Sequence, residues 1–175
     1  MIIVIDIGNS TVVLSGIREE QTLFSGEVDT HREWGREEYI AALQPILRGV
    51  SCRGAIVSSV VPPVTQAVCG AVAALLGVEP MLVTAQSKTG LTLDLPEKEK
   101  VGRDRLVDAA WAASRYPLPA VTADLGTATT LNLILPGGVF AGGIICAGIQ
   151  TCLNALAQRA AQLPQLEVAH PEHLV

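Results

Sequence analysis

The stretch ADLGTATT at residues 123–130 decides the fold, because a similar stretch, IIVIDIGNST at residues 2–11, opens the chain. In both, an apolar run ends in an aspartate, Asp6 or Asp124, followed by one apolar residue, a glycine and small hydroxyl or amide residues. An internal repeat of this kind constrains the whole architecture. It predicts two related domains, each opening with a strand that runs into the same type of turn.

The chemistry of this turn suits an anion. A buried strand delivers the chain to a tight turn, and glycine permits a backbone in which successive N–H groups point into one concavity. A carboxylate beside a phosphate cradle usually holds the metal that neutralises the phosphate charge, which is the role we expect for Asp6 and Asp124. For either copy alone, an ordinary hairpin turn is the alternative. Side-chain donors are available at Asn9, Ser10, Thr11, Thr127, Thr129 and Thr130.

Composition narrows the classes of partner. The 175 residues have a net charge of −5, with 49% hydrophobic and 3% aromatic residues, which favours close-packed α/β layers around a real core. Nothing in this charge favours nucleic acid or an anionic membrane as partner, so we expect a small substrate. Four cysteines without C-x-x-C pairing and the lack of a basic leader favour a cytoplasmic protein with reduced thiols.

Strand and helix patterns alternate along the chain. A helix is expected to begin at Thr30, with Glu33 completing its cap, and to end before Gly49. Residues 87–100 read as a loop, and Pro117 and Pro119 mark a domain boundary, giving domains at 1–118 and 119–175. The other expected strands are 1–5, 11–17, 22–28, 54–61, 80–84, 120–124, 129–135 and 139–142, and the other expected helices are 64–76, 106–116 and 148–162.

Asp104 is the strongest candidate for a catalytic group. It lies between Arg103 and Arg105 at the start of a helix, where the helix N-terminus and both guanidiniums favour an ionised carboxylate. Such a carboxylate can accept a hydroxyl proton during phosphoryl transfer, and Arg105 can pair with a carboxylate on the acceptor. A capping aspartate with solvated neighbours is the alternative.

Together these features resemble the actin, sugar kinase and Hsp70 ATPase superfamily, and in finer detail the type III pantothenate kinases. The resemblance implies an α/β fold of duplicated actin-like ATPase (ribonuclease H-like) domains with mixed sheets, the second copy truncated. It covers essentially the whole chain and rests on IDIGNS at 5–10, IVSSVVPP at 56–63, TGL at 89–91, GRDR at 102–105, DLGTATT at 124–130, GGIICAG at 142–148 and AAQLP at 160–164.

The resemblance implies a transferase that uses ATP and Mg²⁺ to convert pantothenate to 4'-phosphopantothenate, the first step of coenzyme A biosynthesis. It implies that Asp6 lies near the magnesium and that Asp124 binds a monovalent cation, potassium or ammonium. It also implies a homodimer with the acceptor pocket close to the subunit contact. The implied ATP-binding residues are Asp6, Ile7, Gly8, Asn9, Ser10, Thr11, Val12, Val13 and Thr127, and the implied pantothenate site is Gly102, Arg103, Asp104 and Arg105, with Asp104 as proton acceptor.

Three features depart from the family pattern. Residues 95–98, LPEK, replace a tyrosine-containing segment, Ala147 replaces a proline, and residues 119–175 are much shorter than the first copy. A half-domain would expose apolar sheet to water, so we expect a fragment of a longer protein rather than a complete but defective kinase. Two other functions stay open: a non-catalytic relative that binds nucleotide or pantothenate and regulates another process, and a different superfamily kinase or phosphohydrolase.

Overall fold

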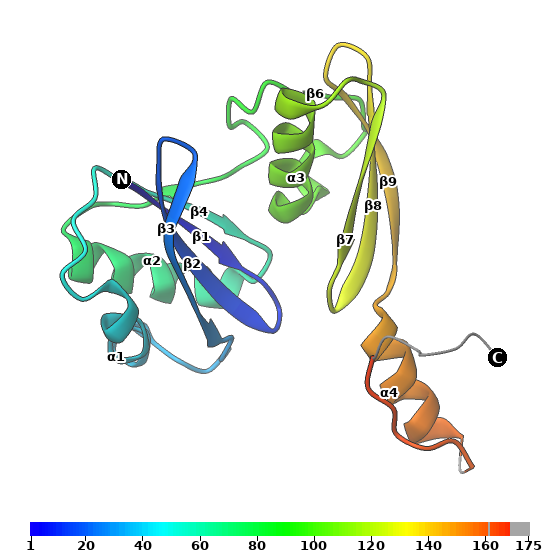
Figure 1. The fold of residues 1–175 in the computed structure, drawn as a ribbon, viewed down its shortest axis with the longest axis horizontal. Coiled ribbons are helices and arrows are strands. Elements are labelled where there is room, and N and C mark those ends of the chain that lie inside the picture. Colours follow the sequence, from blue (N-terminus) through cyan, green and yellow to red (C-terminus); the bar gives the residue numbers. More distant parts are fainter. Residues whose placement is uncertain (161, 169–175) are drawn as a thin grey trace. The chain divides into compact units, whose positions relative to one another are not determined.

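The computed structural model describes residues 1–160 and 162–168, and Figure 1 shows the fold. The chain forms two compact units. The first comprises Met1–Thr89 and Glu97–Val107, and the second comprises Gly90–Pro96 and the chain from Asp108 onward. The second unit thus includes two segments that precede the expected boundary at residue 118. Residues 161 and 169–175, where the AAQLP segment and the expected second domain partly fall, lie outside the described residues.

A five-stranded sheet forms the first unit, in the order β3-β2-β1-β4-β5. Successive strands β1, β2 and β3 pair antiparallel, whereas β4 runs parallel to both β1 and β5, so the sheet is mixed as expected. The strands are β1 (Ile2–Ile7), β2 (Thr11–Arg18), β3 (Gln21–Asp29), β4 (Ala55–Ser59) and β5 (Met81–Leu82), the last much shorter than the strand expected at 80–84.

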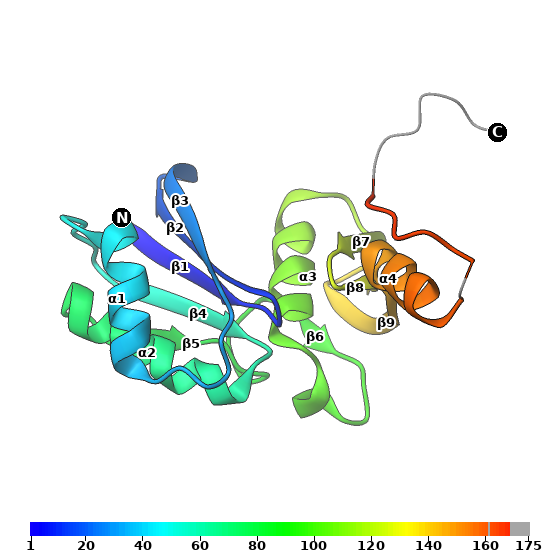
Figure 2. The same cartoon turned by 90° about the horizontal axis from the view of Figure 1, so that it is seen from below.

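Two helices, α1 (Arg36–Leu47) and α2 (Pro62–Leu76), cover one face of this sheet (Figure 2). Successive side chains of a strand point to opposite faces, so the odd-numbered isoleucines of β1 are buried while Asp6 is exposed on the other face. Each buried aliphatic side chain contributes about 1.5–3 kcal/mol. The core consists of Ile3, Ile5, Ile7, Val12, Leu14, Tyr39, Leu43, Leu47, Ala55, Val57, Val61, Val64, Val68, Ala71 and Val72.

The prediction that the first helix begins at Thr30 is wrong, because α1 begins at Arg36. The Thr30 hydroxyl donates a hydrogen bond to the carbonyl oxygen of Gly8, at 2.8 Å, and therefore does not cap a helix. Gly35 is the N-cap instead, and its N–H donates to Oε2 of Glu38 at 3.1 Å. A long-range contact thus replaces the local capping pattern that the sequence suggested.

The second unit contains a four-stranded sheet in the order β6-β9-β8-β7. The last three strands form an antiparallel meander, and β6 runs parallel to β9. Phe140, Ile134 and Asn132 are fully buried, and the Asn132 amide donates to the Thr122 hydroxyl at 3.0 Å. The strands are β6 (Thr92–Leu93), β7 (Ala120–Leu125), β8 (Ala128–Leu135) and β9 (Val139–Ala147), and α4 (Ile149–Arg159) follows β9.

Several boundaries differ from the sequence-based expectation. The helix α3 spans Arg103–Arg115, so it begins before the expected Leu106 and includes Asp104 in its first turn. The expected loop at 87–100 contains β6 and a short 3₁₀ helix, η1 (Lys98–Lys100). β9 continues to Ala147 because its distal half pairs with β8. Across the described residues, every helix is too short or too polar to cross a membrane.

Candidate active site

The first aspartate–glycine turn connects β1 to β2 and is closed by its own backbone. The N–H of Gly8 donates to the carbonyl oxygen of Thr11 at 2.9 Å. Ile7 and Val12 flank the turn with fully buried side chains, so at these two expected ATP positions only backbone groups can reach a ligand. Asn9 and Ser10 are exposed at the tip. The turn therefore presents polar side chains to solvent on a base fixed in the core.

Neither turn glycine has a positive φ, and only Gly8 is closely packed, since a Cβ atom at Gly126 would make ordinary contacts at 3.7 Å or more. The described glycines with positive φ are elsewhere in the chain, so neither Gly8 nor Gly126 adopts the left-handed conformation that favours glycine. At Gly8, a Cβ atom would lie 3.3 Å from the carbonyl oxygen of Thr11, tighter than an ordinary contact. Because the Gly8 N–H is already bonded, donors for a phosphate must come from the residues that follow it.

Asp6 and the segment after β4 meet at the carboxyl end of the parallel strand pair. Asp6 is in register with Ser58 of β4, so their side chains lie on the same face of the sheet. The Val60 N–H donates to the carbonyl oxygen of Ile7 at 3.1 Å. A Cβ atom at Gly102 would lie 3.7 Å from Cγ1 of Val60, which brings the start of α3 to the same edge. Ligands of α/β sheets commonly bind at such carboxyl ends.

Ser58 carries an orphaned polar atom at this edge. The residue is only 7% exposed, and its Oγ atom has no hydrogen-bond partner among the described residues. A buried hydroxyl without a partner is costly, by about 1–3 kcal/mol, unless a ligand or water supplies one. The neighbouring Ser59 is engaged, since its hydroxyl accepts from the Val61 N–H at 3.1 Å. Ser58 thus marks the face beside Asp6 as a place for a polar ligand.

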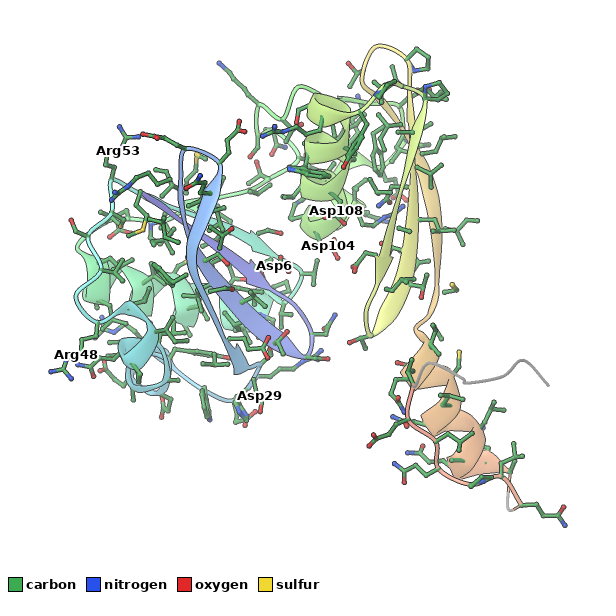
Figure 3. The ribbon with its side chains drawn as sticks, in the orientation of Figure 1. Asp6, Asp29, Arg48, Arg53, Asp104 and Asp108 are labelled. Carbon is green, nitrogen blue, oxygen red and sulfur yellow. The ribbon has the colours of Figure 1, made fainter. Side chains whose placement is uncertain are left out.

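Asp104 stands in the first turn of α3, within the first unit (Figure 3). The first helical hydrogen bond runs from the Leu106 N–H to the carbonyl oxygen of Gly102, at 3.2 Å. One carboxylate oxygen of Asp104 accepts from the Arg105 N–H at 2.7 Å. A Cβ atom at residue 102 would collide with Oδ1 of Asp104. The glycine of the GRDR segment therefore makes room for the carboxylate in its observed position.

The two arginines beside Asp104 differ in their surroundings. The Arg103 guanidinium donates to the carbonyl oxygens of Val101 and Glu99, at 2.9 and 3.0 Å, and lies 3.6 Å from the Glu99 carboxylate. These contacts fix the loop that leads into α3. For Arg105, the Nη2 atom is buried. Arg103 therefore fixes the backbone that leads to Asp104.

The second aspartate–glycine turn, in the second unit, is also closed by a hydrogen bond from its glycine N–H, but over a shorter span. The Gly126 N–H donates to the carbonyl oxygen of Ala128 at 3.0 Å. The carbonyl oxygen of Thr127 accepts from the Gly148 N–H at 3.0 Å and from the Thr151 hydroxyl at 2.8 Å. These bonds attach the N-terminus of α4 to the turn. Both copies of the sequence repeat therefore form a strand–turn–strand unit closed at the glycine, although the closing bond reaches Thr11 in the first and Ala128 in the second.

Thr130 provides an orphaned oxygen beside Asp124. The two residues are in register on β7 and β8, so their side chains lie on the same face. Thr130 is 6% exposed, and its hydroxyl oxygen has no partner within the part of the chain that the structure describes. Asp124 and Thr127 are exposed. A carboxylate and a buried hydroxyl oxygen together suit a hard cation, which prefers oxygen ligands.

The structure thus brings together Asp6–Val13 and Gly102–Arg105 in the first unit, and Asp124 and Thr127 in the second. Sequence reasoning missed Thr30 and Arg32, both of which hydrogen-bond to the first turn. No local signal could have found them, because the contacts join residues more than twenty positions apart.

Comparison with known proteins identifies the family. The family model described as type III pantothenate kinase matches residues 2–175. A type III pantothenate kinase of Halalkalibacterium halodurans is 35% identical over 180 residues, covering 100% of this chain and 71% of that protein. One of Finegoldia magna is 31% identical, covering 100% of this chain and 69% of that protein. The chain spans about seven tenths of the length of these relatives.

Solved structures agree on the fold. The ethanolamine utilization protein EutJ of Carboxydothermus hydrogenoformans matches with a TM-score of 0.54 at 17% identity, covering 93% of this chain and 57% of that one. A Baf family protein of Campylobacter jejuni matches with a TM-score of 0.55 at 15% identity, covering 98% of this chain and 68% of that one. These likenesses support the mixed-sheet α/β architecture. The whole-chain family match and the identity to curated relatives show that this chain belongs to the type III pantothenate kinase family.

Proposed function

We propose that the chain carries out the ATP-dependent phosphorylation of pantothenate to 4'-phosphopantothenate, the first step of coenzyme A biosynthesis. The observation that carries the proposal is the position of Asp104. Contacts through Val60 and Gly102 bring its helix to the carboxyl end of β1, where Asp6 and the first turn lie. A base, an anion-binding turn and a metal-binding carboxylate are the parts that phosphoryl transfer requires.

In the proposed reaction, Asp104 accepts the proton of the primary hydroxyl of pantothenate. The hydroxyl oxygen forms a bond to the γ-phosphorus of ATP as the bond to the β–γ bridging oxygen breaks, and ADP leaves with that electron pair. Asn9 and Ser10 donate hydrogen bonds to the phosphates from the tip of the turn. Gly102 keeps the Asp104 carboxylate in place, and Arg105 pairs with the carboxylate of pantothenate.

The residues present fit the ions that the family resemblance implies. Asp6, beside the orphaned Ser58 hydroxyl, would hold Mg²⁺ together with phosphate oxygens, and Asp124, beside Thr130, would hold potassium or ammonium. Among the described residues no group of three or more His, Cys, Asp or Glu side chains forms a metal cage. When bound, these ions supply positive charge against the phosphates.

Two further parts of the proposal rest on the sequence, the first on the family resemblance and the second on composition and charge. We expect a homodimer with the acceptor pocket close to the subunit contact, which light scattering on the purified chain would test. We also expect a cytoplasmic protein that binds neither nucleic acid nor membrane, which fits its net charge of −5.

The test is an acceptor screen by product analysis. ATP is supplied with pantothenate, glucose, glycerol or no acceptor, and both nucleotide and phosphorylated products are quantified. The proposal predicts equimolar ADP and 4'-phosphopantothenate with pantothenate alone. Phosphate release without an acceptor would indicate a phosphohydrolase, and ATP binding without any turnover would indicate a non-catalytic relative.

A further inference from the structure

The segment between β3 and α1 is fastened to the first turn by Thr30. Its hydroxyl donates to the carbonyl oxygen of Gly8 at 2.8 Å, and its N–H donates to the carbonyl oxygen of Ser10 at 2.8 Å. These two bonds span both sides of Asn9. The backbone around residue 30 is therefore fixed relative to the tip of the turn.

The same segment is held from the helix side by Tyr39. The phenol of this fully buried residue donates to the carbonyl oxygen of His31 and accepts from the His31 N–H, each at 3.0 Å. The rings of His31 and Trp34 also stack, with centroids 3.9 Å apart. Residues 30–31 are thus tied to the turn on one side and to the core on the other.

Arg32 follows directly and extends over the turn. Its Nη2 atom donates to Oδ1 of Asn9 at 2.9 Å, and the residue is exposed. A guanidinium has five N–H donors, so the single bond to Asn9 leaves most of them available. No carboxylate in the described part of the chain lies within ion-pair distance of Arg32, and the neighbouring Glu33 faces His31 instead. Within residues 1–160 and 162–168, no carboxylate therefore forms an ion pair with Arg32.

The charge of Arg32 supplies what the first turn lacks, a positively charged side chain. Residues 6–13, DIGNSTVV, contain no lysine or arginine, and Asp6 contributes a negative charge. Asp29 adds another at the end of β3, in register with Thr11 (Figure 3). Hydroxyl and amide donors alone would have to hold a nucleotide phosphate against these carboxylates. Planar guanidinium groups recognise phosphate oxygens well, often through two parallel hydrogen bonds.

We propose that Arg32 is a nucleotide-phosphate ligand of the first turn, held over it by Asn9 and by the Thr30 anchor. The inference rests on the proposed function, because it takes the ligand of the turn to be ATP. The Arg32–Asn9 bond has a second effect: it keeps the carbonyl oxygen of the Asn9 side chain turned toward Arg32, which leaves the amide N–H groups to donate to phosphate.

Calorimetric titration of the purified chain with MgATP tests the proposal. The variants are Arg32→Gln, which removes the charge, and Arg32→Lys, which keeps it. Arg48→Gln is the matched control, since Arg48 is an exposed arginine just after α1 whose side chain points away from the unit (Figure 3). Arg32→Gln is expected to weaken ATP binding about tenfold, as for loss of a charge-assisted hydrogen bond. Arg32→Lys should lose less and Arg48→Gln nothing.

Kinetics separate binding from folding. Arg32→Gln should raise the KM for ATP by the same factor, with the KM for pantothenate and the melting temperature unchanged. Equal ATP affinity in Arg32→Gln and wild type would overturn the proposal, as would equal losses in both Arg32 variants with a lowered melting temperature. If the wild type binds ATP but transfers nothing to pantothenate, the proposed function fails while the Arg32 comparison still decides this inference. If the wild type does not bind ATP, both fail.

Discussion

The space beside Gly102 holds the carboxylate of Asp104 and has no room for a Cβ atom on residue 102 as well. A methyl group at residue 102 would collide with Oδ1 of Asp104. We therefore predict that Gly102→Ala displaces the proposed base and lowers kcat by about 100-fold, the cost of roughly 1 Å of misplacement. ATP affinity should stay at the wild-type value, because the first turn is untouched.

Gly54→Ala is the matched control for that substitution. A Cβ atom at Gly54 would meet only Cδ1 of Ile2, at 3.9 Å, which is an ordinary contact. This variant should keep wild-type turnover and stability. Full activity in Gly102→Ala, measured beside it, would show that the Asp104 carboxylate does not need its observed position.

Thr30→Val should destabilise the first turn, although Thr30 itself lies just after β3 and outside that turn. The substitution removes the hydroxyl that donates to Gly8, so we expect a loss of about 1 kcal/mol in the free energy of unfolding and a raised KM for ATP. Thr30→Ser keeps the donor and should restore both. Chemical denaturation and initial rates measure the two effects. Thr22→Val, the same change at an exposed position of β3, is the control and should alter neither.

The phenol of Tyr39 should lose its proton at a higher pH than an ordinary tyrosine. Burial raises the pKa of its phenol above the ordinary value of about 10, and the Glu33 carboxylate adds to this against the hydrogen bond to His31. Folding therefore favours the neutral phenol, and this stabilisation is present below pH about 10 and is lost as pH rises through the folded-state pKa. Titration followed by ultraviolet absorbance should show, in the wild type, a tyrosinate signal that appears only above the pH at which an ordinary tyrosine ionises. If Tyr39→Phe retains that signal, the buried bond to His31 is not as described.

Gly148→Ala should disrupt the second turn. A Cβ atom there would collide with the backbone oxygen of Gly126 and lie 2.7 Å from that of Thr127, and backbone cannot yield as a flexible side chain can. We expect a loss of about 1–3 kcal/mol or more in stability. Hydrogen exchange should show faster exchange at residues 124–130, with no change in β1 or β2. Uniform protection throughout would contradict the packing of α4 on this turn.

The elements that the sequence predicted correctly depend on local patterns. Burial alternates along β1 and β2, as their sequence patterns predicted. The helix predicted at 64–76 is α2, although it begins two residues earlier, at Pro62, because prolines suit a first helical turn that has no partner for its N–H groups. The duplication of the aspartate–glycine turn was also readable from sequence. In each case the deciding residues lie within a few positions of one another.

The elements that were missed depend on contacts between distant segments. α1 starts late because Thr30 bonds to Gly8 instead of capping a helix. β9 continues through the glycines at 142 and 143 because β8 offers a partner of matching length. The same holds for the candidate site. The GRDR segment could be recognised from the sequence, but its proximity to Val60 could not. No local sequence pattern indicated that Arg32 contacts the first turn.

The most direct test of the account measures pantothenate-dependent ATP consumption by the wild type, Asp104→Asn and Asp108→Asn. The two aspartates lie on α3 one turn apart, so the variants have the same charge and the same chemical change (Figure 3). We predict turnover in the wild type and Asp108→Asn, and a loss of 100-fold or more in Asp104→Asn with ATP affinity retained, as for removal of a general base. Pantothenate-dependent turnover at the wild-type rate in Asp104→Asn would contradict the central claim.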